Sequence, residues 1–144
     1  MTTQNYANHA QFVPGFHFVL APLIFLTLIG SAVNLYLSWG DHERIYSAAL
    51  ILVLVVCVFL TALFGRVFAL KAQDRAIRAE ENLRHYVMTG KLLDPRLDTR
   101  QVIGLRFASD AEFVALAKKA ADEQLSERAI KQAVQQWRPD TYRV

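Results

Sequence analysis

The chain has 144 residues, of which 53% are hydrophobic and 20% are charged, and its formal net charge is +3. A single cysteine, Cys57, excludes an internal disulfide and a cysteine-based zinc site. Hydrophobic residues are concentrated in residues 12–70, which are almost free of charge, whereas most charges follow from Lys71 onward. This division indicates a membrane part and a water-facing part rather than one soluble core.

The amino-terminal residues 1–13 form a polar arm that is too short to fold alone. The arm contains no Lys or Arg, and no small-residue cleavage site follows the first apolar segment. A secretory signal peptide needs both features, so we expect both apolar segments to be retained as membrane spans.

Two apolar segments predict a transmembrane hairpin over residues 14–70. The first span covers about residues 14–38, and Pro22 within it predicts a mild bend. A loop of five residues, 40–44, requires the second span, about residues 45–70, to run antiparallel to the first. No proline interrupts residues 45–88, so we expect one helix that crosses the bilayer and continues into water.

Basic residues predict the orientation of the hairpin. The loop has one of them, Arg44, whereas five others, from Arg66 to Arg84, lie at or just beyond the far end of the second span. The positive-inside rule therefore places both termini in the cytoplasm. Four of these five side chains could bind anionic lipid head groups, or they could act on topology alone. They are Arg66, Lys71, Arg75 and Arg78.

A heptad seam made mostly of alanine follows the membrane. Its positions alternate at spacings of three and four, which is typical of a coiled-coil face. Alanine allows close approach of two helices but buries little area, so the seam predicts a partner helix. The sequence leaves open whether the chain's own carboxyl-terminal helices cover the seam or another chain does. A helical stalk is expected over residues 71–90, ended by Gly90. The seam residues are Ala69, Ala72, Ala76, Ala79, Leu83 and Tyr86.

Residues 91–144 predict three short amphipathic helices. The first begins at Asp98 or Thr99 and extends to about Phe107. The second begins with a capping box from Ser109 and extends to about Gln124, and the third covers about residues 126–137. The predicted fold is therefore all-α: a two-helix transmembrane hairpin, a cytoplasmic helical stalk, and short carboxyl-terminal helices that pack on the stalk.

Small and weakly polar residues line one face of each span. Such rows let membrane helices approach closely and form hydrogen bonds, so they predict helix packing. No ionisable residue lies at mid-depth, which argues against a pump, carrier or channel built from one copy. The rows contain Thr27, Ser31 and Asn34 in the first span, and Cys57, Thr61 and Gly65 in the second.

No catalytic constellation is evident. The sequence has no phosphate-binding glycine loop, nucleophile elbow or His-x-x-x-His pair, so we predict no enzyme activity, cofactor or small-molecule substrate. Tyr6, His9 and His17 could bind a metal or a lipid head group, but interfacial polar residues are the simpler interpretation. The acidic residues Asp74, Glu80 and Glu81 among arginines indicate ion pairs between residues four apart on a solvated helix.

Three segments, residues 4–9, 71–85 and 105–110, resemble a family of small bacterial membrane proteins with two predicted spans and no assigned function. The middle segment, KAQDRAIRAEENLRH, is the longest and most specific. The resemblance implies a bacterial inner-membrane location and no particular activity.

Three functional hypotheses follow. The leading one is a non-enzymatic interaction or scaffold protein that uses its cytoplasmic helices to bind a partner or another copy of itself. The second is an accessory subunit of a larger membrane transporter or enzyme complex. The third is a membrane-tethered nucleic-acid binder, because the last two predicted helices have the length of a helix-turn-helix. The low basic charge of the last helix, with Arg128, Lys131 and Arg138 beside Glu127, weighs against this third hypothesis.

Overall fold

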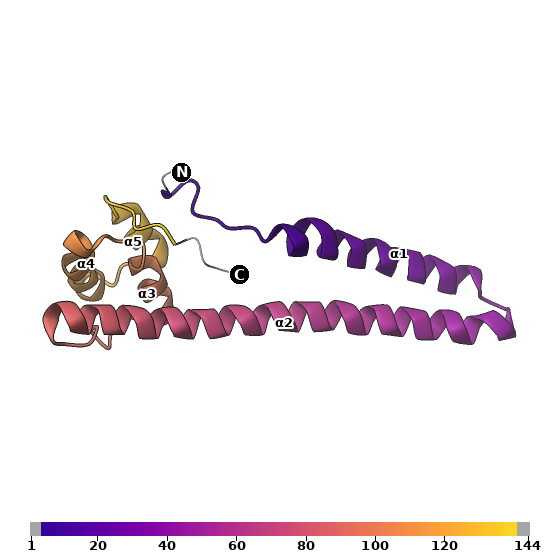
Figure 1. Cartoon of the computed structure of the whole chain (residues 1–144). Coiled ribbons are helices and arrows are strands. Elements are labelled where there is room, and N and C mark those ends of the chain that lie inside the picture. The colour runs from indigo at the N-terminus through magenta and orange to yellow at the C-terminus, as the bar shows by residue number, and fades with distance from the viewer. Residues whose placement is uncertain (1–3, 141–144) are drawn as a thin grey trace. The chain divides into compact units, whose positions relative to one another are not determined.

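The computed structural model describes residues 4–140, so the ends of the predicted arm and of the carboxyl-terminal region lie outside the described residues. Every regular element of the described chain is a helix, which confirms the predicted all-α class (Figure 1). It divides into two compact units, residues 12–69 and residues 1–11 with 70–144, which are considered separately. The helices are η1 Gly15–Leu20, α1 Ala21–Leu37, α2 His42–Thr89, α3 Thr99–Leu105, α4 Asp110–Asp122 and α5 Glu127–Ala133.

Residues 12–69 form a helical hairpin. In it η1 and α1 run antiparallel to the first part of α2 (Figure 1), and the connection turns at Gly40, whose φ is +92°. The helices over Gly15–Leu37 and His42–Thr89 are both long and apolar enough to cross a membrane. Most of their large apolar side chains are exposed, as in helices whose apolar surface is not covered by the chain itself.

The start of the hairpin is wound as a π-helix rather than an α-helix. Residues Gly15–Leu20 form it, and the N–H of Ala21 donates to the carbonyl of Phe16, five residues back. Pro22 follows directly, near the start of α1. Because proline has no N–H and its ring crowds the preceding turn, wider winding is one way for a helix to accommodate it. The sequence predicted a mild bend at Pro22, and the structure shows π-helical winding in the residues just before it.

The second long helix, α2, runs without interruption over 48 residues, as its composition predicts. It ends where expected. Gly90 adopts a φ of +74°, and its N–H donates to the carbonyl of Tyr86 at 2.7 Å. A residue with a side chain would be strained in this left-handed conformation, which explains glycine at this position.

The three short helices surround a small core of their own. Phe107, Phe113 and Ile130 are fully buried in it, and α3 packs closely on α5. Gly104 permits this approach, because a Cβ atom there would lie 3.1 Å from the carbonyl oxygen of Glu127. In Figure 1, α3, α4 and α5 gather beside the carboxyl-terminal part of α2.

Side-chain caps start these helices where the sequence placed them. Asp98 accepts a hydrogen bond from the backbone N–H of Gln101 at 2.7 Å, and the Gln101 side chain accepts from the backbone N–H of Asp98 at 2.8 Å. Ser126 caps α5 by accepting from the backbone N–H of Ala129 at 3.2 Å. Such caps satisfy backbone groups that have no partner inside the helix.

The predicted end of the last helix was wrong. α5 ends at Ala133 instead of near Trp137, because the following segment is extended and pairs with Ala108 in the connection between α3 and α4. Arg138 donates its backbone N–H to the carbonyl of Phe107 at 2.7 Å, and the Trp137 ring lies 4.9 Å from the Phe107 ring. Long-range pairing and aromatic packing outweigh the local helical pattern here.

The amino-terminal arm packs on the short helices. Gln4 accepts from the backbone N–H of Asp140 at 2.7 Å, and His9 contacts the rings of Phe107 and Trp137, each with a centroid distance of 5.8 Å. The arm is therefore ordered by contacts with residues about a hundred or more positions away, which a local pattern does not reveal.

Candidate functional site

The stalk part of α2 has two faces that differ in their surroundings. One face carries Ile77 and Glu81, which are buried, and Arg84 and His85, which are half-buried. The opposite face carries the alanine seam. Helices contact their neighbours through residues three and four apart, so each set forms a continuous strip.

Arg84 connects the stalk to the short helices through several contacts. Its guanidinium donates to Asp110 at 2.6 and 2.8 Å and to the carbonyl oxygen of Ala108 at 2.8 Å. It also stacks 4.1 Å from the centre of the Phe113 ring. A planar guanidinium with five donors suits such a combination of polar and aromatic partners.

Glu81 lies within the same network. It accepts from Arg84 at 2.9 Å, lies 3.5 Å from Arg138, and has a side chain only 6% exposed. The sequence interpretation of a solvated helix surface was therefore wrong for Glu81 and Arg84. It failed because alternating charges look the same on a solvated face and on a face covered by a small domain.

An open polar cavity of about 350 Å³ lies beside this network. Three carboxylates and two guanidinium groups line it. Both guanidinium groups, those of Arg84 and Arg138, already form ion pairs with Glu81. These contacts are those of a structural junction between stalk and domain. The lining residues are Glu80, Glu81, Arg84, Asp110 and Arg138.

The short helices leave the alanine seam uncovered. All six predicted seam residues, Ala69, Ala72, Ala76, Ala79, Leu83 and Tyr86, are exposed. Leu83 is 63% and Tyr86 is 53% exposed, and Val87 beside them is exposed as well. The short helices do pack on the stalk, but on its polar face, so an apolar strip faces outward.

The predicted basic cluster is distributed over different surroundings. Lys71 and Arg75 are exposed on the stalk. Arg78 donates to the hydroxyl of Thr99 at 3.1 Å and is engaged by the domain. Arg66 lies 5.4 Å from the centre of the Phe16 ring at the open end of the hairpin. Lipid binding by these four side chains stays a prediction.

The predicted rows of small and weakly polar residues lie partly on covered and partly on exposed faces of the two long helices. Ser31 is buried and Asn34 is half-buried, whereas Thr27 is exposed. In α2, Cys57, Thr61 and Gly65 are all exposed. The hydroxyls of Thr27, Ser31 and Thr61 each donate to a carbonyl of their own helix, at 2.7, 2.9 and 2.8 Å. Packing of the open rows against another helix stays a prediction.

The structure separates the polar residues of the amino-terminal region. Tyr6 stacks on His9, with ring centroids 5.7 Å apart, and both belong to the unit with the short helices. His17 belongs to the hairpin unit, where its ring contacts Phe12 and Phe16. Among residues 4–140, no group of three His, Cys, Asp or Glu side chains has the arrangement of a metal site.

A surface ion-pair cluster fixes the turn between α2 and α3. Arg96 donates to Asp94 and to Asp122, each at 2.8 Å. The hydrogen bond from the Arg96 side chain is the main cause that holds the pKa of Asp94 below its usual range, and the two carboxylates raise the pKa of Arg96. The Asp94 carboxylate therefore keeps its charge until the pH falls below the ordinary range of an aspartate.

The whole chain, residues 1–144, matches the model of a family described as "Family of unknown function (DUF6526)". The chain belongs to this family. No curated protein and no solved structure matches the chain. The resemblance noted in the sequence, to a family without an assigned function, agrees with this membership.

Proposed function

We propose that this DUF6526 protein is an integral protein of a bacterial inner membrane that presents its stalk and short helices in the cytoplasm as an interaction module. Two helices of sufficient length and hydropathy support the membrane location. The proposal assigns no catalysis and no cofactor, and both termini face the cytoplasm.

The observation that carries this proposal is the contrast between the two stalk faces. The domain binds the polar face through Glu81 and Arg84, although an apolar face was available. The seam from Ala69 to Tyr86 therefore stays open in a single chain. An open apolar strip on a water-facing helix is typical of a protein-binding surface.

The hypothesis of an accessory subunit uses the same surface and differs only in what covers it. Nucleic-acid binding is the least supported of the three hypotheses. One of the few basic side chains of α5, Lys131, already forms an ion pair with Glu127 at 2.6 Å. α5 also has only seven residues, which is short for a helix that inserts into a DNA groove.

Site-specific photo-crosslinking in native membranes tests the proposal. Benzoylphenylalanine replaces Ala76 or Tyr86 on the seam, and replaces Lys71 or Met88 at exposed positions away from it. We expect adducts with a protein from the seam positions and none from the two controls. Seam positions that give no protein adduct, or the same adducts as the controls, would contradict an interaction function for this surface.

A further inference from the structure

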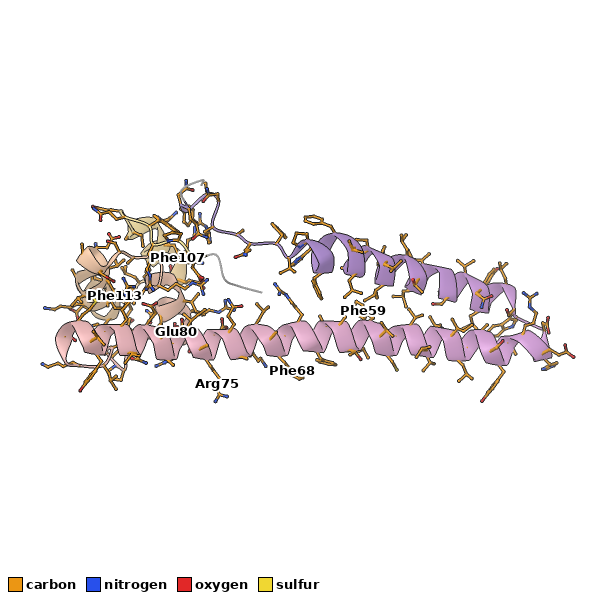
Figure 2. All side chains as sticks on the ribbon, viewed as in Figure 1. Phe59, Phe68, Arg75, Glu80, Phe107 and Phe113 are labelled. Atoms are coloured by element: carbon orange, nitrogen blue, oxygen red, sulfur yellow. The ribbon has the colours of Figure 1, made fainter. Side chains whose placement is uncertain are left out.

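Two opposite charges flank the alanine seam at positions that matter in coiled coils. With Ala69, Ala76 and Leu83 as heptad positions a, and Ala72, Ala79 and Tyr86 as positions d, Arg75 occupies position g and Glu80 position e. Both side chains are exposed, and neither has an ion-pair partner among residues 4–140. Glu80 lies at the edge between the two stalk faces, because it also lines the open cavity beside Arg84. Figure 2 shows Arg75 projecting from α2 on the side away from the short helices.

The spacing of these charges distinguishes between a parallel and an antiparallel pair of stalks. In a parallel pair of helices, a g residue of one chain meets the e residue five positions later on the other. Arg75 and Glu80 are five positions apart, so two copies in register would form two symmetric Arg75–Glu80 pairs. An antiparallel pair would place e beside e and g beside g, and it would lose both attractions.

The membrane supplies the same orientation independently. Copies of one protein insert into a bilayer in the same direction, so their stalks leave the membrane side by side and parallel. Closed two-fold symmetry about an axis normal to the membrane then places one seam on the other. Confinement to the membrane also raises the effective concentration of the stalks, which compensates for the small area that alanines bury.

We propose that the seam from Ala69 to Tyr86 binds the seam of a second copy in a parallel, in-register pair, with Arg75 of each copy beside Glu80 of the other. The inference rests on the proposed interaction function and names its partner. The four alanines set a short distance between the helices, and Leu83 and Tyr86 contribute most of the apolar area at the end far from the membrane. The short helices lie on the outer faces of the pair.

Disulfide crosslinking of the full-length protein in isolated membranes tests this arrangement. Cys57→Ala removes the native thiol, and single cysteines are then introduced as Ala72→Cys, Ala76→Cys or Ala79→Cys. Mild oxidation should give a dimer at each of these positions, because a parallel in-register pair brings identical seam positions together. Lys71→Cys and Met88→Cys, both exposed but away from the seam, are the controls.

Charge reversal provides a second measurement that does not depend on cysteine reactivity. Added to Ala76→Cys, either Arg75→Glu or Glu80→Arg alone places like charges together and should slow dimer formation about fivefold. The double variant Arg75→Glu with Glu80→Arg exchanges the charges and should restore the rate. Equal expression and an unchanged helical signal show that the single variants still fold.

The outcomes separate this inference from the proposed function. Dimers at the seam positions, none at the controls, and recovery in the double variant support the parallel pair. Crosslinks only between unlike positions, such as Ala72→Cys with Leu83→Cys, overturn it. Photo-adducts at Ala76 whose mass is that of a different protein would contradict a second copy as the partner but would support the interaction function. Absence of any photo-adduct at the seam would contradict both proposals.

Discussion

At the scale of single residues, the junction between stalk and domain depends on two charged side chains that are mostly buried, Glu81 and Arg84. Arg84 satisfies its donors with Glu81, Asp110 and a backbone carbonyl, and it stacks on Phe113. A buried ion pair gains little over a well-packed apolar pair, but removing one partner leaves the other charge without compensation. The individual residues of the network should therefore be sensitive to substitution.

Replacement of Glu81 tests this sensitivity. Glu81→Ala should lower the free energy of unfolding by about 2–4 kcal/mol, because the guanidinium of Arg84 loses a carboxylate at a site where it is mostly buried. Urea unfolding of the full-length protein in detergent, followed by the fluorescence of the half-buried Trp137, measures the change. The matched substitution Glu123→Ala, at an exposed carboxylate on the end of α4, should change stability by less than about 0.5 kcal/mol. Equal effects of the two substitutions would show that the network contributes nothing specific.

At the scale of elements, helix starts were more predictable from the sequence than helix ends and partners. Ser109, Ser126 and Asp98 mark starts through local hydrogen bonds, which depend only on residues a few positions away. The end of α5 depends on Trp137 meeting Phe107, a contact between segments thirty residues apart. The contacts of the amino-terminal arm with the short helices join residues that are even farther apart in the sequence. The face of α2 that the domain covers was also missed, because apolar pattern favours the alanine seam while the observed contact uses arginine and glutamate.

The close contact of α3 with α5 gives a prediction about packing. Gly104→Ala introduces a methyl group 3.1 Å from the carbonyl oxygen of Glu127 and 3.2 Å from Cγ2 of the fully buried Ile130. Alanine improves helix propensity by up to about 1 kcal/mol, but overpacking a core costs about 1–3 kcal/mol. We expect a net loss of about 1 kcal/mol in the same urea assay. Gly104→Ala combined with Ile130→Val, which removes a methyl group, should be less destabilised than the sum of the two single variants. Strict additivity would mean that the methyl groups do not meet.

At the scale of the whole molecule, the sequence divides the chain into an apolar hairpin and a charged region, and the structure divides it at nearly the same residue, between Ala69 and Leu70. In the sequence, this division follows from composition, because a bilayer and water require different surfaces. The same contrast predicts the direction of insertion. Four basic side chains, from Arg66 to Arg78, lie at or just beyond the end of the second span, and the short loop has only Arg44.

Accessibility of single cysteines in bacterial spheroplasts tests the direction of insertion. In a Cys57→Ala background, His42→Cys reports on the loop and Lys118→Cys reports on the exposed side of α4. A membrane-impermeant maleimide should label His42→Cys in intact spheroplasts and Lys118→Cys only after permeabilisation, because the positive-inside rule predicts that the basic residues keep the stalk in the cytoplasm. Labelling of both variants in detergent controls for thiol reactivity. The reverse pattern would place the seam outside the cytoplasm, and the interaction partner would then belong to that compartment.

Lys71→Glu with Arg75→Glu, which removes two of the four basic residues at the end of the span, should increase the fraction of inverted molecules, since orientation follows the difference in basic charge and not the sequence of the spans.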